Sequence, residues 1–395
     1  MKSILQIAKV LQINIRSLPS RWASSLVAIV GIAGVVAVFV TILSIANGLQ
    51  ETASRGGADD VLVIMGQGSG AELNSSLLNS EVTSIEQLEN IARDTNNDPI
   101  VSPELYVIVD LKKQSTGLDA NMPLRGVTNN AMLLRPNFKL IEGRMFTPGL
   151  NEIIVGKSIL GNYQNLEFGS ELKWGKNVWT VVGVFEDNGS AAESEIWTDS
   201  RVLQSAYNRN VYSTARLKAA NSQALESIQA AIDADPKLNL TVKSEKEFLS
   251  EQTEIMNVVI NVIGTALAVL MGIAASFGAI NTMYTAVASR TREIATLRAL
   301  GFGRGSIIFS VLTESIILGL LGGLLGGLLA YLFFNGFQVS TLSWTSFTQL
   351  AFEFSVSPSI LVSGMFAALI IGIIGGLLPS IRAARIPISQ ALREL

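Results

Sequence analysis

The hydrophobic residues of this chain are concentrated in four long runs that contain almost no charge. The runs cover residues 22–50, 255–289, 305–337 and 354–381, and the only charged residue within them is Glu314. A helix needs about 20 apolar residues to cross the roughly 30 Å hydrocarbon core of a bilayer. Each run is long enough, so the pattern predicts four transmembrane helices.

A long polar segment, residues 51–250, lies between the first two runs. It contains short strand-like and helical patterns, as a folded α/β domain does. Strand-like runs occur at residues 60–65, 105–111, 152–155, 171–174, 178–185, 211–217 and 238–242, and a helical pattern occurs at 221–233. The residues from Trp174 to Asn177 are typical of a hairpin turn. The strand, helix and strand from 211 to 242 indicate a βαβ or split βαβ unit. We therefore expect a mixed α/β domain, large enough for two small lobes.

Two helix starts are marked by capping boxes. Ser84 with Gln87 predicts a helix that runs to about residue 94, and Ser244 with Glu247 predicts a second helix. If the second one continues from 246 to 289, its 44 residues would extend about 66 Å, roughly twice the thickness of the hydrocarbon core. We therefore expect residues 251–289 to contain both a stalk outside the membrane and the second span.

Basic residues orient the four predicted spans. Lys and Arg without any acid occur in residues 1–21, and Arg residues outnumber acids in 290–304 and 382–395, whereas the short segment 338–353 has neither Lys nor Arg. By the positive-inside rule, both termini and 290–304 are cytoplasmic. Residues 51–250 and the short loop 338–353 are then outside the cytoplasm. The absence of Cys is compatible with a multi-pass protein of a bacterial inner membrane that faces an oxidising periplasm.

The N-terminal segment, residues 1–21, has an amphipathic pattern. Its apolar stripe consists of Ile4, Ile7, Ala8, Leu11, Ile15 and Leu18, with Lys2, Lys9 and Arg16 off the stripe. This pattern predicts a helix that lies on the inner leaflet. A cleaved signal peptide is not expected, because the apolar run that follows is far longer than the 7–15 residues typical of a signal.

Composition excludes several kinds of chemistry. The chain is 49% hydrophobic and contains no Cys and no His, which excludes a disulfide framework, a thiolate nucleophile and a typical zinc site. The carboxylate pairs Asp59/Asp60 and Glu193/Glu195 therefore favour a solvated acidic surface. Glu314 alone does not make a proton relay, so we expect it to pair with Arg298 or Arg304. No catalytic residue, metal site or bound cofactor is predicted.

One short motif resembles part of a phosphate-binding loop. Val155-Gly-Lys-Ser158 has the ending of that loop, but the loop needs a Gly five residues before Gly156, and residue 151 is Asn. We therefore expect a turn from a strand into a helix here, and no nucleotide site.

Small residues recur at helical spacing within three of the predicted spans. Such residues let helices approach closely in lipid. In the third and fourth spans the pattern favours packing within one chain, and in the second it favours a seam between two chains. The residues are Gly264, Ala268 and Gly272, then Gly319, Gly323 and Gly327, and finally Gly372 and Gly376.

Residues 291–300 predict one amphipathic helix between the second and third spans, ended by Gly301. The sequence "SRTREIATLRALGFGRGSI", which starts at Ser289 and includes this helix, resembles the segment after the second span in ABC permeases of the MacB/FtsX-like family. The C-terminal "GLLPSIRAARIPISQALREL" resembles the closing motif of the same family. "IEGRMFTPGLNEIIVGKSIL" and "GKNVWTVVGVFED", both within 141–187, resemble its periplasmic core domain, whose lobes are porter-like.

The resemblance implies a membrane subunit without a fused ATPase, so ATP and Mg would be bound and used on a separate ABC ATPase. Residues 290–304 would be the coupling helix that docks on it. The family's coupling residues correspond here to Arg290, Arg292, Glu293, Ile294, Leu297, Arg298, Ala299, Leu300 and Gly301, and its C-terminal cytoplasmic motif to Pro379, Arg382 and Arg385. Family members often have Glu at the position of Glu314.

The implied function is that of a MacB-like efflux permease, which transmits ATP-driven motion to a periplasmic domain for export or extraction. The implied partners are two ATPase copies, a second permease copy or paralogue, and a periplasmic adaptor with an outer-membrane channel. Two other functions within the family stay open, namely lipoprotein release and FtsX-like activation of a cell-wall hydrolase. A membrane-anchored binding or structural protein without an ATPase is the alternative from another class.

Overall fold

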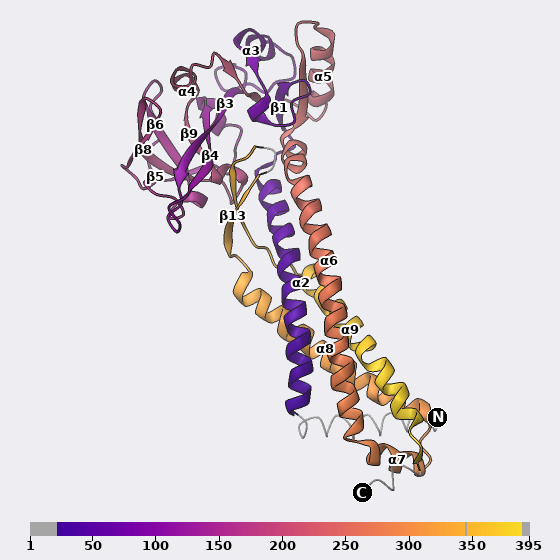
Figure 1. Ribbon diagram of the computed structural model, residues 1–395. Helices are drawn as coiled ribbons and strands as arrows, with labels where there is room; N and C mark the ends of the chain where they lie inside the picture. Colours follow the sequence, from indigo (N-terminus) through magenta and orange to yellow (C-terminus); the bar gives the residue numbers. More distant parts are fainter. Residues whose placement is uncertain (1–21, 344–345, 389–395) are drawn as a thin grey trace. The chain divides into compact units, whose positions relative to one another are not determined.

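A computed structural model describes residues 22–343 and 346–388. The predicted N-terminal amphipathic helix and residues 389–395 lie outside this part. Four helices are long and apolar enough to cross a membrane: α2 (Trp22–Gly56), α6 (Glu245–Ala288), α8 (Arg304–Phe334) and α9 (Pro358–Arg385) (Figure 1). A mixed α/β domain separates the first two, which confirms the predicted fold class.

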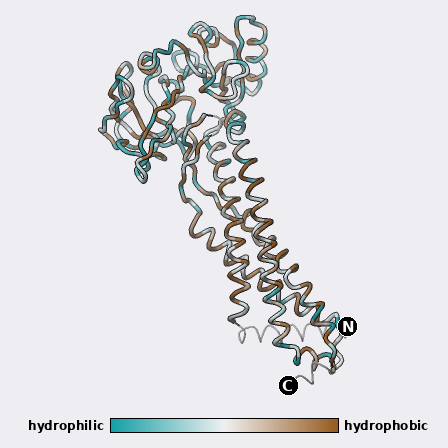
Figure 2. Tube along the Cα trace, viewed as in Figure 1, coloured by the Kyte–Doolittle hydropathy of each residue, from teal (hydrophilic) through white to brown (hydrophobic). Residues whose placement is uncertain are grey.

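The chain divides into two compact units. Residues 48–258 and 338–353 form one unit, called here the sheet unit, and the other described residues form the helical unit. Figure 2 shows the long helices coloured mainly as hydrophobic, whereas hydrophilic residues are frequent in the sheet unit. The chain passes between the units four times, because α2 and α6 contain residues of both and 338–353 joins α8 to α9.

Glycines of α8 allow close packing inside the helical unit. A Cβ on Gly319 would lie 2.8 Å from the carbonyl oxygen of Ala368 in α9, and one on Gly326 would lie 2.4 Å from that of Ala33 in α2. Ser315 also donates a 2.7 Å hydrogen bond to the carbonyl of Gly372 in α9. The glycine stripes of α8 and α9 therefore pack within one chain, as the sequence predicted.

The helix α6 is a single element of 44 residues, as predicted. Ser244 caps its start, because its Oγ accepts a hydrogen bond from the backbone N–H of Glu247 at 3.2 Å. Gly264, which was assigned to a seam between two chains, instead packs inside this chain, where its Cβ would lie 2.2 Å from the side chain of Ile42. A Cβ on Gly272 would meet nothing within 4 Å.

The sheet unit is built on one mixed sheet of ten strands, in the order β12-β1-β11-β3-β4-β9-β6-β8-β5, with β7 paired to β8. Neighbouring strands are antiparallel except for the pairs β4/β9 and β6/β8. The strands are β1 (Val61–Gly66), β3 (Val101–Lys112), β4 (Asp119–Val127), β5 (Lys139–Gly143), β6 (Glu152–Gly156), β7 (Glu171–Trp174), β8 (Asn177–Glu186), β9 (Ile196–Asp199), β11 (Thr214–Lys218) and β12 (Leu240–Ser244).

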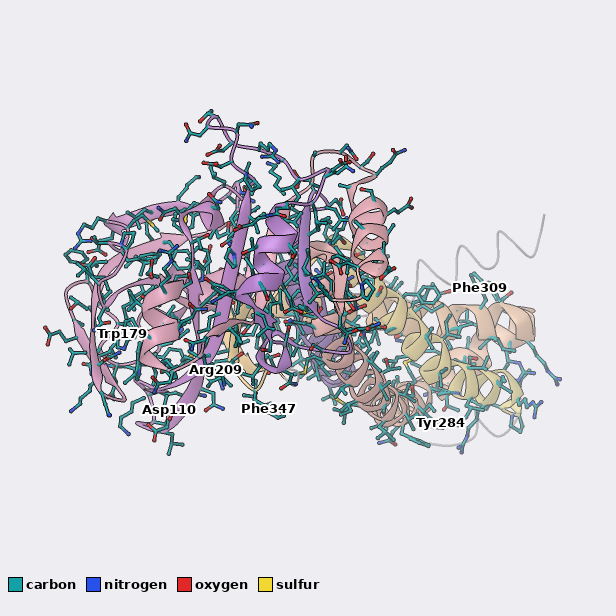
Figure 3. All side chains as sticks on the ribbon, turned by 90° about the horizontal axis from the view of Figure 1, so that it is seen from above. Asp110, Trp179, Arg209, Tyr284, Phe309 and Phe347 are labelled. Carbon is teal, nitrogen blue, oxygen red and sulfur yellow. The ribbon has the colours of Figure 1, made fainter. Side chains whose placement is uncertain are left out.

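The two largest hydrophobic clusters of the sheet unit both include residues of β3. One contains Leu62, Ile64 and Leu217 and packs under α3 (Asn79–Glu86) and α5 (Ala224–Ala234). The other contains Leu124 and Trp179, which is labelled in Figure 3 and whose side chain is fully buried. These two clusters are called the first and the second lobe here, and the division of the domain into two lobes stays a prediction. A small separate sheet pairs β2 (Leu77–Leu78) with β10 (Val211–Tyr212), and α4 (Ser200–Ala206) packs on the second lobe.

The local predictions in this unit had different outcomes. The hairpin turn is confirmed, because Trp174 pairs with Asn177 across β7 and β8. The helix predicted from Ser84 to residue 94 is wrong, because α3 ends at Glu86 and Asn90 has a positive φ of 66°. The true start of α3 is stabilised by Glu81, whose carboxylate accepts a 2.7 Å hydrogen bond from the N–H of Leu78.

The expected short loop 338–353 is a β-hairpin of β13 (Gln338–Leu342) and β14 (Gln349–Glu353). It packs on the sheet unit through polar contacts. The N–H of Ala351 donates to Ser194 Oγ at 2.9 Å, and Thr348 Oγ1 lies 3.1 Å from the hydroxyl of Tyr106. The two strands of the link between α8 and α9 therefore belong to the sheet unit.

Candidate functional site

The predicted coupling helix is present as α7 (Thr291–Ala299). It starts after Arg290 and ends before Gly301, whose φ is +94°. Glycine adopts such a left-handed conformation at little cost and commonly ends a helix. A short helix therefore connects α6 to α8, with a basic residue, Arg298, in its last turn.

An ion pair ties the start of α7 to α8. The guanidinium of Arg290 donates to both oxygens of Glu314, at 2.9 and 2.5 Å, and both side chains are buried. The prediction that Glu314 pairs with Arg298 or Arg304 was wrong. Sequence spacing missed Arg290 because it directly follows α6, where the chain turns back towards α8. The Nε of Arg290 is buried and has no hydrogen-bond partner among the described residues.

The apolar face of α7 packs against the ends of the other helices. Ile294 and Leu297 lie in a cluster with Val287 of α6, Val311 of α8 and Ala383 of α9, among others. Arg298 donates a hydrogen bond to the backbone carbonyl of Ile386, just beyond α9. Three long helices thus contact α7 at one end of the helical unit.

The predicted coupling residues fall on two sides of α7. Arg290 and Ile294 are buried, and Leu297 and Arg298 are half-buried, so these four attach α7 to the helical unit. Arg292, Glu293, Ala299, Leu300 and Gly301 are exposed. Leu300 is 72% exposed. A cavity of about 290 Å³ lies beside α7, between the ends of α6 and α8.

The predicted C-terminal motif lies on the last turns of α9. Pro379 is buried inside the helix. Arg382 is exposed, and its guanidinium lies 5.4 Å from the ring centre of Tyr284 in α6. Arg385 is exposed and ends the helix. The motif thus extends the contact between α6 and α9 next to α7.

The sequence that resembles a phosphate-binding loop is a turn, as predicted. It leaves β6 at Gly156 and enters a 3₁₀ turn, η4 (Lys157–Ile159). A Cβ on Gly156 would lie 2.1 Å from the carbonyl oxygen of Glu193. The glycine is needed for this close approach between two segments of the sheet unit.

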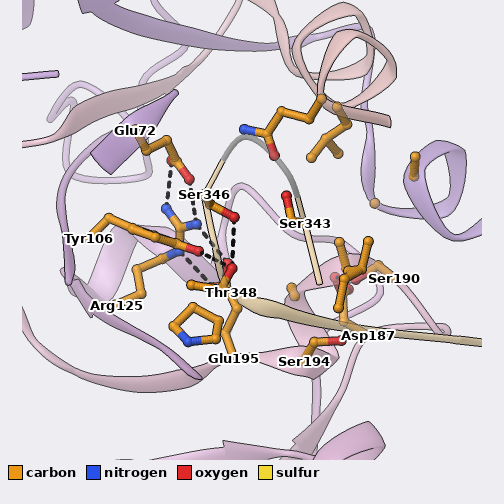
Figure 4. Close-up of a pocket in the computed structure, with 18 of the residues that line it drawn as sticks. Glu72, Tyr106, Arg125, Asp187, Ser190, Ser194, Glu195, Ser343, Ser346 and Thr348 are labelled. Atoms are coloured by element: carbon orange, nitrogen blue, oxygen red, sulfur yellow. Dashed lines mark hydrogen bonds and ion pairs between the residues drawn. The ribbon is translucent and has the colours of Figure 1, made fainter. Parts of the chain in front are cut away.

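A second group of functional-looking residues, not predicted from the sequence, is buried in the sheet unit. Arg125 in β4 uses all five N–H groups. It donates to Glu72 and to Glu195 at 2.7 Å through two bonds each, and to Glu104 at 2.9 Å. The guanidinium carbon of Arg125 also lies 5.0 Å from the centre of the Tyr106 ring. Figure 4 shows Arg125 between Glu72 and Glu195.

Two further arginines extend this buried network. Arg216 in β11 donates to Glu72 and Glu104 and contacts Glu245 in the first turn of α6. Arg135 lies within 3.4 Å of Glu104. Burial alone would raise the pKa values of Glu72 and Glu104, but the surrounding guanidinium groups hold both pKa values below the ordinary range. Both carboxylates are therefore ionised at neutral pH.

One expectation about acidic residues was wrong and another was confirmed. Asp59 and Asp60 are solvated, and each lies near an exposed lysine. Glu193 and Glu195 were expected on the surface too, but Glu193 is only 4% exposed and Glu195 is paired with Arg125. The network joins residues up to 173 positions apart, from 72 to 245, so sequence spacing carried no signal for it.

A polar pocket of about 80 Å³ lies beside this network. Asp187, Ser190 and Ser194 lie on one side of it, and Arg125 with Glu72 on the other (Figure 4). The hairpin of β13 and β14 contributes Ser343, Ser346 and Thr348. Leu249, Gln252 and Thr253 of α6 also line the pocket. Among the described residues, no group of three or more carboxylates is arranged to hold a metal ion.

These elements define a class: a multi-pass membrane protein with a large α/β domain between its first two spans and a short helix between its second and third. Comparison with known families matches residues 25–235, more than half of the chain, to the MacB-like periplasmic core domain. It matches residues 265–388 to the FtsX-like permease C-terminal region. The chain therefore belongs to the MacB/FtsX-like family of ABC transporter permeases. Neither matched region is an ATP-binding domain.

Similar proteins include permeases with and without a fused ATP-binding part. An uncharacterized ABC transporter permease, YknZ of Bacillus subtilis (strain 168), is 24% identical over 299 residues, which is 70% of each chain. The macrolide export ATP-binding/permease protein MacB of Bordetella avium (strain 197N) is 26% identical over 392 residues. That match covers 93% of this chain and 56% of MacB, so the chain spans just over half of MacB.

Solved structures similar to this chain cover parts of such proteins. The extracellular domain of the noncanonic ABC-type transporter YknZ from Gram-positive bacteria matches 47% of this chain and all of that one, with 14% identity and a TM-score of 0.36. The periplasmic region of MacB from Actinobacillus actinomycetemcomitans matches 50% of this chain and 94% of that one, with 15% identity and a TM-score of 0.37. Both scores are below 0.5, so the family assignment rests on the sequence matches.

Proposed function

We propose that this permease transmits ATP-driven motion from a separate ABC ATPase to its extracytoplasmic sheet unit, for export or extraction of a substrate. The observation that carries the proposal is the attachment of α7. Its exposed face, with Arg292 and Leu300, is available to a partner, while its buried face is fixed to the other helices by the Arg290–Glu314 ion pair and by Ile294.

Rigid attachment is what transmission of a movement requires. A displacement of α7 cannot be absorbed by a loose loop, because the buried ion pair and the apolar cluster would both have to break. The chain then leads from the helical unit to the sheet unit four times, through α2, α6 and both ends of the β13–β14 hairpin. These four connections support mechanical coupling rather than conduction of a solute.

The helical unit offers little for a solute pathway. Glu314 is the one charged residue inside the four apolar runs, and it is neutralised by Arg290. Intramembrane charges usually mark ion or substrate paths. Their scarcity favours a substrate that is handled by the sheet unit, outside the membrane.

The family assignment makes an ABC ATPase the expected partner. We propose two ATPase copies and a second permease chain, in the bacterial inner membrane with both termini cytoplasmic. An adaptor with an outer-membrane channel is a further proposed partner. Co-purification tests it directly: an adaptor would support export, whereas a lipoprotein or a cell-wall hydrolase would assign release or signalling instead.

The coupling role is tested with Leu300→Asp in a complex with an ABC ATPase that co-purifies with the unsubstituted chain. We expect loss of co-purification, or a fall of about tenfold in permease-dependent ATP turnover, because a charge replaces an exposed apolar contact. Leu118→Asp is the matched control, since Leu118 is also exposed, at 68%, but lies in the sheet unit. Normal coupling in Leu300→Asp would reject α7 as the docking surface.

A further inference from the structure

The polar pocket of the sheet unit contains a buried carboxylate that the charge network leaves uncompensated. Asp187 is 4% exposed and lines the pocket. One of its oxygens, Oδ2, accepts a 2.6 Å hydrogen bond from Ser190. Its other oxygen receives no hydrogen bond or ion pair from the described residues and is not fully enclosed, so it is open to the pocket. A carboxylate in this position can receive a positive group that enters the pocket.

The charges around the pocket do not balance. Four buried or largely buried carboxylates and three buried guanidinium groups line it, and Arg125 and Arg216 are already committed to the network described above. The carboxylates are those of Glu72, Asp187, Glu195 and Glu245, and the guanidinium groups are those of Arg125, Arg135 and Arg216. Glu245 has an unsatisfied atom, because its Oε2 is buried without a hydrogen-bond partner among the described residues.

The groups nearest to Asp187 make this imbalance local. Burial raises the pKa of Asp187, and the neighbouring Glu193 and Glu195 add to this effect, while Ser190 and Arg135 oppose it. Arg135 is bonded to Glu104 and stacks on Trp197, with 4.7 Å between its guanidinium carbon and the ring centre. It therefore compensates Asp187 only from a distance.

We propose that this pocket binds a small primary ammonium group, held by Asp187 and by the hydroxyl oxygens around it. The acceptors are of the right kind, since Ser190, Ser346 and Thr348 all line the pocket. A cavity of about 80 Å³ has room for a few non-hydrogen atoms. A metal ion fits less well, because the carboxylates do not converge as a ligand set.

The hairpin that joins α8 to α9 forms part of this site. The hydroxyl oxygens of Ser346 and Thr348 lie 2.7 Å apart, and the Thr348 hydroxyl also contacts the hydroxyl of Tyr106. An ammonium group between Asp187 and these hydroxyls would join the hairpin to the segment 187–195 by hydrogen bonds. The site is independent of the ATPase-docking proposal, because no residue of α7 takes part in it.

The test uses the full chain purified in detergent, with thermal unfolding at pH 7.5 as the readout. Methylammonium chloride is compared with tetramethylammonium chloride, which has the same charge but no N–H donor. We expect a saturable rise of the unfolding midpoint by about 3 °C or more with methylammonium, and no such rise with tetramethylammonium. In Asp187→Asn the rise should disappear, and in Ser190→Ala it should need a higher concentration.

Glu186→Gln is the matched control, because Glu186 is the adjacent carboxylate but pairs with the exposed Lys157. It should keep the methylammonium response. An equal response to both cations, or a response that persists in Asp187→Asn, would overturn the proposal. A third outcome would also overturn it. If methylammonium leaves the unfolding midpoint of the wild type unchanged, but lowering the pH from 7.5 to 5.5 raises that midpoint in the wild type and not in Asp187→Asn, the site holds a proton instead.

Discussion

Arg290 and Glu314 form a two-point ion pair between the residue before α7 and the middle part of α8. Both side chains are at most 7% exposed. The pair therefore does more than neutralise a charge in an apolar helix. It fixes the start of the proposed coupling helix to the helix that follows it, and it explains why Glu314 is tolerated in an apolar run.

Removing one member of this pair should destabilise the protein strongly. Glu314→Gln leaves the Arg290 charge buried and unpaired, which costs about 3–5 kcal/mol. The double variant Arg290→Met with Glu314→Leu removes both charges and should regain most of that loss. Unfolding of the purified protein in mixed micelles measures the difference. A double variant as unstable as the single one would show that the pair acts through some other contact.

The glycines of the helical unit should respond according to what faces them. Gly319→Ala places a methyl group against the backbone of α9, 2.8 Å from the carbonyl oxygen of Ala368. We expect a loss of about 1–3 kcal/mol in the free energy of unfolding. Gly272→Ala meets nothing within 4 Å and should leave the stability of the single chain unchanged. Equal effects of the two substitutions would contradict the described packing.

The sheet unit should lose stability in acid. The folded-state pKa values of Glu72 and Glu104 lie below the ordinary value of 4.5, so their contribution is present above that pH. It is lost as the pH falls below 4.5 towards the lowered values. Asp187 has the opposite sign, because its raised pKa favours the folded state at low pH.

The acid effect is measured by tryptophan fluorescence, since Trp197 lies beside the network and donates to Glu195 at 2.8 Å. We expect the temperature of the unfolding midpoint to decrease as the pH is lowered below 4.5. Glu104→Gln should make this pH dependence weaker, and it should also lower the stability at pH 7. Unchanged pH dependence in Glu104→Gln would mean that other carboxylates cause the transition.

The β13–β14 hairpin should be held to the sheet unit by its hydroxyl contacts. Thr348→Val removes the bonds to Tyr106 and Ser346 with little change in shape. At about 1 kcal/mol for each of the two bonds, amide hydrogen exchange in 349–353 should accelerate roughly thirtyfold. Thr83→Val is the control, because that hydroxyl bonds only to its own helix. Unaltered exchange after Thr348→Val would show that other contacts hold the hairpin.

The sequence predicted the periodic parts of this fold well. Four charge-poor runs gave the four long helices, and the capping pattern at Ser244 located the start of α6. These features depend on neighbours within a few positions along the chain. The helix predicted from Ser84 failed, although its signal was also local, because Ser84 lies inside α3 rather than at its start.

The candidate sites depend on residues that the fold brings together from distant positions. Arg290 and Glu314 are 24 positions apart, and Arg125 meets Glu72 and Glu195 from different parts of the sheet. No spacing rule connects such residues, because the strand order decides which of them meet. The segment 338–353 is rich in β-branched and aromatic residues, and this strand signal could have predicted the hairpin.

Transmission of ATP-driven motion is tested most directly by a distance measurement between the two units. The chain has no Cys, so spin labels can be placed at Leu150→Cys in the sheet unit and Val362→Cys in α9, both exposed. In the complex with its ATPase, we expect ATP to change the distance distribution, and Leu300→Asp to abolish the change. The same ATP-dependent change in Leu300→Asp, or none in the wild type during ATP hydrolysis, would contradict the account.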